Sequence, residues 1–155
     1  AMVEILRDMG AEIRWEGETL VSRASKLHGL RVDCAQVPDL VPILAVAMAA
    51  AEGESRITGA ARLRIKESDR LSAMAAALTA AGADVSELPD GLIIRGGKRL
   101  HAAKIEGCND HRIVMAMTMA SEIADGELMI TDAEATAKSA PAFWREFEHL
   151  GGLAR

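Results

Sequence analysis

Charged residues are concentrated in the stretch RLRIKESDRL at 62–71, where six of the ten side chains are ionisable and the flanking sequence is rich in alanine. Smaller polar groups follow in NDHR at 109–112 and TAKS at 136–139. Each group lies at the start of an expected helix, where free N–H groups and the helix dipole favour anions. We therefore predict a site for a small ligand that carries phosphate and carboxylate, with four cationic side chains around it: Lys66, Arg70, Arg112 and Lys138.

Taken singly, the same residues also fit ordinary structural roles. Asp39 and Asp110 are good helix N-caps. The carboxylate and guanidinium three residues apart within KESDR fit a surface ion pair, worth about 0.2–0.5 kcal/mol. A first-turn histidine such as His111 often caps or packs, and Lys138 alone fits a solvated lysine. Only the joint placement of these residues at helix starts favours a functional site.

The helices and strands expected to position these residues occur twice in the same order. The first run is predicted as a helix at 2–9 stopped by Gly10, strands at 11–15, 19–23 and 30–34, a buried helix from Asp39 to Gly53, and a strand at 55–59. The second run is predicted as a helix with Ser68 as its N-cap and Gly82 at its end, strands at 83–88, 92–96 and 103–107, a buried helix at 110–123, and a strand at 127–131.

Short identities support an internal repeat at a nearly constant offset. The matches are Gly10-Ala11-Glu12 with Gly82-Ala83-Asp84, Ile57-Thr58 with Ile130-Thr131, and Lys66 with Lys138. The predicted fold class is α+β, with repeated α-β-β-β-α-β units in which buried helices pack against mixed sheets. We place the repeats at about 2–66 and 68–138 and a final helix at 139–150. Side by side, the two units bring their charged helix starts to one end.

Composition excludes several classes of function. A net charge of -5, with 3% aromatic residues and no tyrosine, argues against nucleic-acid binding. No apolar run reaches the roughly 18 residues of a membrane span. Cys34 and Cys108 form no CxxC pair, so the sequence indicates neither a zinc site nor a disulfide framework. A reducing cytoplasm is the predicted location.

Three motifs, in this order and spacing, carry a family resemblance. KESDR at 66–70, NDHR at 109–112 and TAKS at 136–139, together with VPD at 37–39, resemble the 5-enolpyruvylshikimate-3-phosphate synthase family (3-phosphoshikimate 1-carboxyvinyltransferases). The resemblance covers essentially the whole chain. It implies a two-domain enzyme in which each domain has three repeated α+β units and the substrates bind between the domains. Residues 1–155 would be the C-terminal part of one domain, about two of its three units.

The resemblance also implies roles for individual residues. Asp39 matches the carboxylate that contacts the 5-hydroxyl of shikimate 3-phosphate, and Glu67 matches the acid–base residue near the vinyl carbon of phosphoenolpyruvate. Lys66 is implied in both catalysis and binding. The family reaction joins the 5-hydroxyl to C2 and protonates C3, and loss of phosphate follows; neither metal nor cofactor is implied. The residues implied in binding phosphoenolpyruvate, or beside it, are Lys66, Arg70, His111, Arg112 and Lys138.

The resemblance implies further segments that this sequence does not contain, with a lysine near the N-terminus of the family enzyme and several serine, arginine and glutamine residues of its first domain, which mainly bind shikimate 3-phosphate. We therefore expect the chain alone to lack turnover and to need the N-terminal portion of the same enzyme as its partner. Two alternatives remain. One is the sister enzyme that transfers enolpyruvyl to UDP-N-acetylglucosamine, and the other is a non-catalytic anion-binding module.

Overall fold

The computed structural model describes residues 1–155, and its elements follow one another in two similar runs. The first run is α1 (Met2–Asp8), β1 (Glu12–Glu16), β2 (Thr19–Arg23), β3 (Arg31–Asp33), α2 (Val41–Ala50) and β4 (Gly53–Thr58). The second is α3 (Arg70–Ala80), β5 (Asp84–Leu88), β6 (Gly91–Gly96), β7 (Leu100–Ile105), α4 (His111–Ala120) and β8 (Ala124–Ile130), and α5 (Phe143–His149) ends the chain.

Strand pairing follows the same rule in both runs. The first two strands of each run form an antiparallel pair, β1 with β2 and β5 with β6. The next two strands are parallel and are joined through a helix, so that α2 connects β3 to β4 and α4 connects β7 to β8. Pairing of β4 with β6 links the runs and gives a four-stranded sheet in the order β3-β4-β6-β5. The predicted class, α+β with mixed sheets, is confirmed.

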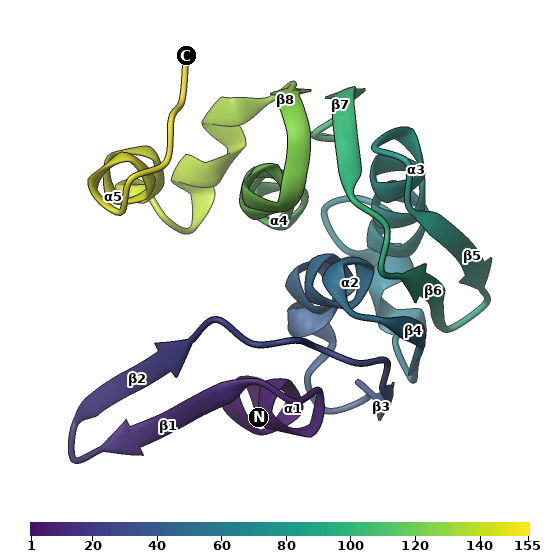
Figure 1. Cartoon of the computed structure of the whole chain (residues 1–155). Coiled ribbons are helices and arrows are strands. Elements are labelled where there is room, and N and C mark those ends of the chain that lie inside the picture. The colour runs from purple at the N-terminus through teal and green to yellow at the C-terminus, as the bar shows by residue number, and fades with distance from the viewer.

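The two crossover helices form the centre of the core. Figure 1 shows α2 and α4 in the interior with the strands around them, while the β1–β2 hairpin extends to one side. Helix α2, VPILAVAMAA, is apolar on all sides and packs on α4, α3 and β6, as expected for a buried helix. Its proline lies in the first turn, where no helical N–H is lost.

Two glycines end corresponding helices, as the sequence predicts. Gly10 follows α1 with φ +96° and Gly82 follows α3 with φ +92°, a conformation that glycine adopts without strain. A Cβ at Gly10 would lie 3.2 Å from the ring of His28, and a Cβ at Gly82 would lie 2.5 Å from the ring of His101. Both helices therefore end at a glycine with positive φ, and in both places a histidine ring packs against that glycine. The repeat boundaries at 2–66 and 68–138, and the final helix at 139–150, stay a prediction.

Details of the predicted elements need correction. Ser68 does not cap α3: the cap is Asp69, whose Oδ1 accepts the Ser72 N–H at 3.1 Å. Asp39 caps no helix, because it lies in a short 3-10 turn, η1 (Pro38–Leu40), ahead of α2. Strands β7 and β8 each begin three residues earlier than predicted, where polar residues weaken the apolar alternation.

Candidate functional site

The predicted site residues lie in four loops that follow the carboxyl ends of parallel strands. Asp39 lies in η1 after β3, and Glu67 lies between β4 and α3. His111 and Arg112 open α4 after β7. Lys138 ends a 3-10 segment, η4 (Ala133–Lys138), after β8. Carboxyl ends of parallel strands are the usual place for ligand sites in sheets with helical crossovers.

Arg70 is the centre of a charged cluster rather than an exposed cation. Only 1% of its side chain is exposed, and all three guanidinium nitrogens donate to carboxylates. Nε and Nη2 bind the two oxygens of Asp110 at 2.8 and 3.1 Å. Nη1 donates to Asp39 Oδ1 at 3.0 Å, and Nη2 also donates to Glu67 Oε2 at 2.6 Å. The predicted Glu67–Arg70 contact therefore exists, but it is not a surface pair.

Asp110 anchors this cluster and was not among the predicted site residues. Its side chain is fully buried. Besides the two bonds from Arg70, it accepts the Arg112 N–H at 3.0 Å as the cap of α4 and the Ser68 hydroxyl at 2.9 Å. Burial acts to raise the pKa of Asp110, but the bonds from Arg70, Arg112 and Ser68 outweigh it, so that the pKa lies below its usual value. Asp110 therefore remains a carboxylate within the core.

Asp39 and Glu67 are the two carboxylates of the cluster that reach solvent. Their side chains are 44% and 43% exposed, in contrast to the buried Asp110. Arg112 lies beside Asp39, with Nη2 3.4 Å from Oδ2 and Nη1 donating to the Asp39 carbonyl oxygen at 3.2 Å. One face of each carboxylate is thus held by arginine while the other is open to a ligand.

His111 adds an unsatisfied polar atom to this open side. The ring is buried, and its Nδ1 is the one buried side-chain polar atom without a hydrogen-bond partner. Nδ1 lies 4.0 Å from Glu67 Oε1 and 3.9 Å from Asp110 Oδ1. Buried polar atoms normally have partners, so an unpaired ring nitrogen beside Glu67 is suited to a group that binds there.

The two lysines stand apart from the arginine cluster. Lys138 Nζ donates to the carbonyl and side-chain oxygens of Asn109 at 2.5 and 2.8 Å, and Asn109 adopts a φ of +47°. Lys66 is exposed and makes no hydrogen bond or ion pair. The structure thus joins Arg70 and Arg112 through Asp39, whereas no contact connects Lys66 or Lys138 to them.

Arg64 anchors the loop that carries Lys66 and Glu67 to the neighbouring β5–β6 turn. This arginine donates to the carbonyl oxygens of Leu88 and Pro89 at 2.7 and 2.8 Å, which tie the loop to the β5–β6 turn. It also pairs with Asp69 at 2.9 Å. Sequence reasoning did not single out Arg64, although it lies within the charged stretch, because nothing local indicates which backbone carbonyls it reaches.

Chemically, the arrangement offers two positioned carboxylates and several cations. Asp39 and Glu67 both accept hydrogen bonds from the Arg70 guanidinium, which fixes the two carboxylates relative to one another. Arg112, Lys66 and Lys138 add positive charge in the same group of loops. No three His, Cys, Asp or Glu side chains converge closely enough to hold a metal ion. None of the helices has the length and apolar character needed to cross a membrane.

Comparison with known proteins identifies one family. The model of the family described as EPSP synthase (3-phosphoshikimate 1-carboxyvinyltransferase) matches residues 1–147. A curated 3-phosphoshikimate 1-carboxyvinyltransferase from Clostridium novyi is 46% identical over 153 residues, which are 99% of this chain and 35% of that protein. One from Halobacterium salinarum is 46% identical over 99% of this chain and 36% of its own length. The chain therefore spans about 35% of the length of the curated relatives it matches.

Solved structures give the same result for the fold. EPSP synthase from Acinetobacter baumannii superposes with a TM-score of 0.86 at 35% identity, covering 97% of this chain and 38% of that one. The enolpyruvyl transferase NikO from Streptomyces tendae superposes with a TM-score of 0.81 at 20% identity, covering 98% of this chain and 35% of its own. The second likeness concerns the fold alone.

Proposed function

Since the chain belongs to the EPSP synthase (3-phosphoshikimate 1-carboxyvinyltransferase) family, we propose that it works as the C-terminal part of such an enzyme. The reaction transfers the enolpyruvyl group of phosphoenolpyruvate to the 5-hydroxyl of shikimate 3-phosphate and releases phosphate. Residues 1–155 contribute about two of the three α+β units of one domain. The partner is the N-terminal portion of the same enzyme, and the cytoplasm is the proposed location, in keeping with two free cysteines.

One observation carries this proposal: two half-exposed carboxylates are fixed on a single buried arginine. Asp39 and Glu67 each keep one side open while Arg70 holds the other. Adding an alcohol across a vinyl group requires one group to remove a proton from oxygen and another to deliver a proton to carbon. Two carboxylates with separate orientations suit these two tasks.

In the proposed mechanism, Asp39 accepts the proton of the 5-hydroxyl as its oxygen bonds to C2 of phosphoenolpyruvate. Glu67 donates a proton to C3, and a tetrahedral intermediate forms. Removal of a proton from C3 by Glu67 then regenerates the double bond as the C2–O bond to phosphate breaks, and the departing phosphate takes up the proton that Asp39 had accepted. Lys66, Arg112 and Lys138 stabilise the carboxylate and phosphate charges throughout.

The contacts of Arg70 support a role that differs from the one implied by the resemblance. Its nitrogens already bind three carboxylates, so contact with substrate requires an exchange of one of them. We propose that Arg70 chiefly positions Asp39 and Glu67, and binding of phosphoenolpyruvate by Arg70 stays a prediction. His111, whose Nδ1 has no hydrogen-bond partner and lies beside Glu67, is more available to a bound ligand than Arg70 is.

The experiment is a fusion in which this chain replaces the matching segment of the Clostridium novyi relative. Phosphate release is measured with phosphoenolpyruvate and shikimate 3-phosphate, and also with UDP-N-acetylglucosamine as the competing acceptor. The chain alone is expected to give no turnover. In the fusion, Glu67→Gln is expected to lower kcat by about 10²–10⁴-fold with little change in KM, because it removes the proton donor and keeps the shape.

Glu18→Gln serves as the matched control, since Glu18 is exposed in the β1–β2 turn and makes no side-chain contact. A folded fusion that turns over neither acceptor would favour the non-catalytic anion-binding module. Turnover selective for UDP-N-acetylglucosamine would instead establish the sister activity.

A further inference from the structure

Two arginines lie side by side on the outer face of the four-stranded sheet, away from the residues discussed so far. Arg31 on β3 and Arg56 on β4 are direct partners in the parallel register. Alternation along the strands turns the next residue of each, Val32 and Ile57, toward the core. The two guanidinium groups are therefore carried on the same face of adjacent strands, and both are exposed.

The nearby acids do not neutralise this pair. On the same sheet, Glu54 and Asp84 both pair with Arg95, at 3.1 and 3.3 Å. Arg31 and Arg56 make no ion pair and no side-chain hydrogen bond. Like charges directly opposite one another on neighbouring strands destabilise a sheet, so an anion that binds between these two arginines would relieve their repulsion.

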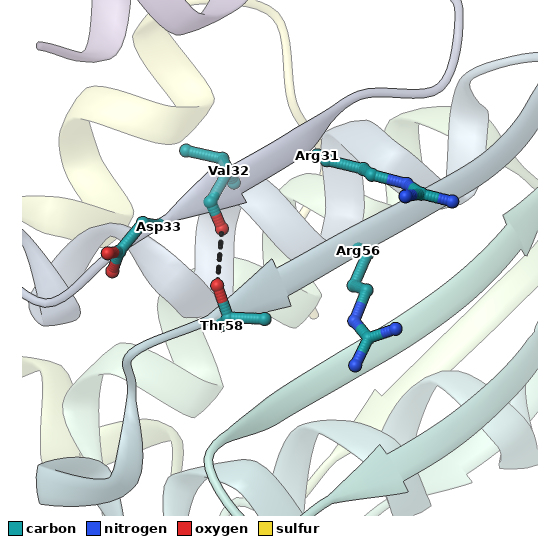
Figure 2. A pocket seen from close by; sticks show the side chains of 5 residues that line it. All are labelled: Arg31, Val32, Asp33, Arg56 and Thr58. Atoms are coloured by element: carbon teal, nitrogen blue, oxygen red, sulfur yellow. Dashed lines mark hydrogen bonds between the residues drawn. The ribbon is translucent and has the colours of Figure 1, made fainter.

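The arginines also line a hollow of a size suited to a small ligand. Its volume is about 310 Å³, and Figure 2 shows its lining residues: Arg31, Val32, Asp33, Arg56 and Thr58. The Thr58 hydroxyl reaches the Val32 carbonyl oxygen only at 3.5 Å, which leaves it weakly held as a donor. Asp33 is the one acid present, and its Oδ1 accepts the Ala35 N–H at 2.9 Å.

We propose that this hollow binds phosphate, free or as the phosphomonoester group of a small molecule. Two unpaired guanidinium groups supply the charge that balances the dianion, each can donate to phosphate oxygens, and the weakly held Thr58 hydroxyl is a third donor at the same hollow. The small volume of the hollow favours a small anion, and the net charge of -5 on the chain disfavours binding to a polyanionic surface. None of the lining residues belongs to the carboxylate cluster, so this site is independent of the proposed function.

The test is a titration of the ¹⁵N-labelled chain with inorganic phosphate at low ionic strength, followed by amide and arginine Nε–H NMR signals. We expect saturable shifts at Arg31, Arg56 and Thr58. Removal of one charge-assisted bond by Arg31→Gln or Arg56→Gln is expected to weaken binding about tenfold. Asp33→Asn keeps the acceptor for Ala35 but removes the like charge, and it is expected to tighten binding several-fold.

Arg23→Gln is the matched control, because Arg23 is an exposed strand arginine on β2 with no side-chain contact. Its affinity for phosphate should equal that of the unmodified chain. Two results would overturn the site: shifts that do not saturate, or equal weakening by Arg23→Gln and Arg31→Gln, which indicates nonspecific charge screening. Shifts confined to the loops of Lys66 and Lys138 would likewise exclude this hollow. A phosphomonoester tested in parallel separates the two ligand forms.

Discussion

Substitution of Asp110 by asparagine tests the central claim that the charged cluster depends on one buried carboxylate. Asparagine keeps the Oδ1 acceptor for the α4 cap but places an amide NH₂ toward the Nε–H of Arg70 and the Ser68 hydroxyl. The Ser68 hydroxyl can turn to accept from this amide, but the Nε–H of Arg70 loses a bond to a charged acceptor, worth about 1.5–3 kcal/mol, and the buried guanidinium loses its buried counter-charge. Because the side chains of Asp110 and Arg70 are 0% and 1% exposed, solvent screens little of the loss, and we expect about 3–5 kcal/mol.

The assay is urea unfolding of the unmodified and substituted chains, followed by circular dichroism, with the m-value as a check that the same transition is compared. Asp69→Asn is the matched control. Asp69 also caps a helix and pairs with an arginine, but its side chain is 38% exposed, so its loss should be about 1 kcal/mol. A loss below about 1 kcal/mol for Asp110→Asn would equal that of an exposed pair and would refute the reasoning.

Three further predictions follow from the same contacts. The pKa of Asp110 is lower in the folded protein than its ordinary value of 3.8, so ionised Asp110 stabilises the fold above pH 3.8. This stabilisation is lost as the pH falls through the pKa of the folded state, and acid unfolding should therefore be less steep in Asp110→Asn. Burial raises the pKa of Cys34 to about 11 and also raises the pKa of Cys108, but Cys108 is partly exposed whereas Cys34 is buried, so iodoacetamide should label Cys108 first and Cys34 only in urea, as read by mass spectrometry. Arg64→Gln should speed tryptic cleavage after Lys66 several-fold, because the loop loses its bonds to the β5–β6 turn.

The fold was largely predictable because its signals are local. One all-apolar helix and one that is apolar on nearly all sides, αL glycines after α1 and α3, and short alternating strands each leave a pattern within a few residues. Predicted helix 110–123 matches α4 and the 3-10 turn that continues it to Ile123. The predicted strand at 103–107 misses the first three residues of β7, where Leu100 and His101 follow the basic pair at 98–99 and the apolar alternation is weak.

The hydrogen bonds and ion pairs of the site were less predictable because they join residues that are distant in the sequence. Motif spacing indicated which residues lie in the site, but not that Arg70 faces Asp110, 40 residues away, and Asp39, 31 residues away. Asp110 and Ser68 looked like ordinary caps, and only the tertiary structure shows that they hold the arginine. The roles of individual residues in catalysis stay a prediction.

The shared arginine also bears on how this segment tolerates change over evolution and in design. The loops after β3, β4 and β7 each place a carboxylate on Arg70, so a change in one loop alters the surroundings of the other two carboxylates. Substitutions at Asp39, Glu67 and Asp110 should show epistasis, with double variants departing from the sum of single ones. A loop transplanted alone from a relative would bring its carboxylate into a cluster shaped by two others. We therefore expect the three loops to vary together, by joint substitution.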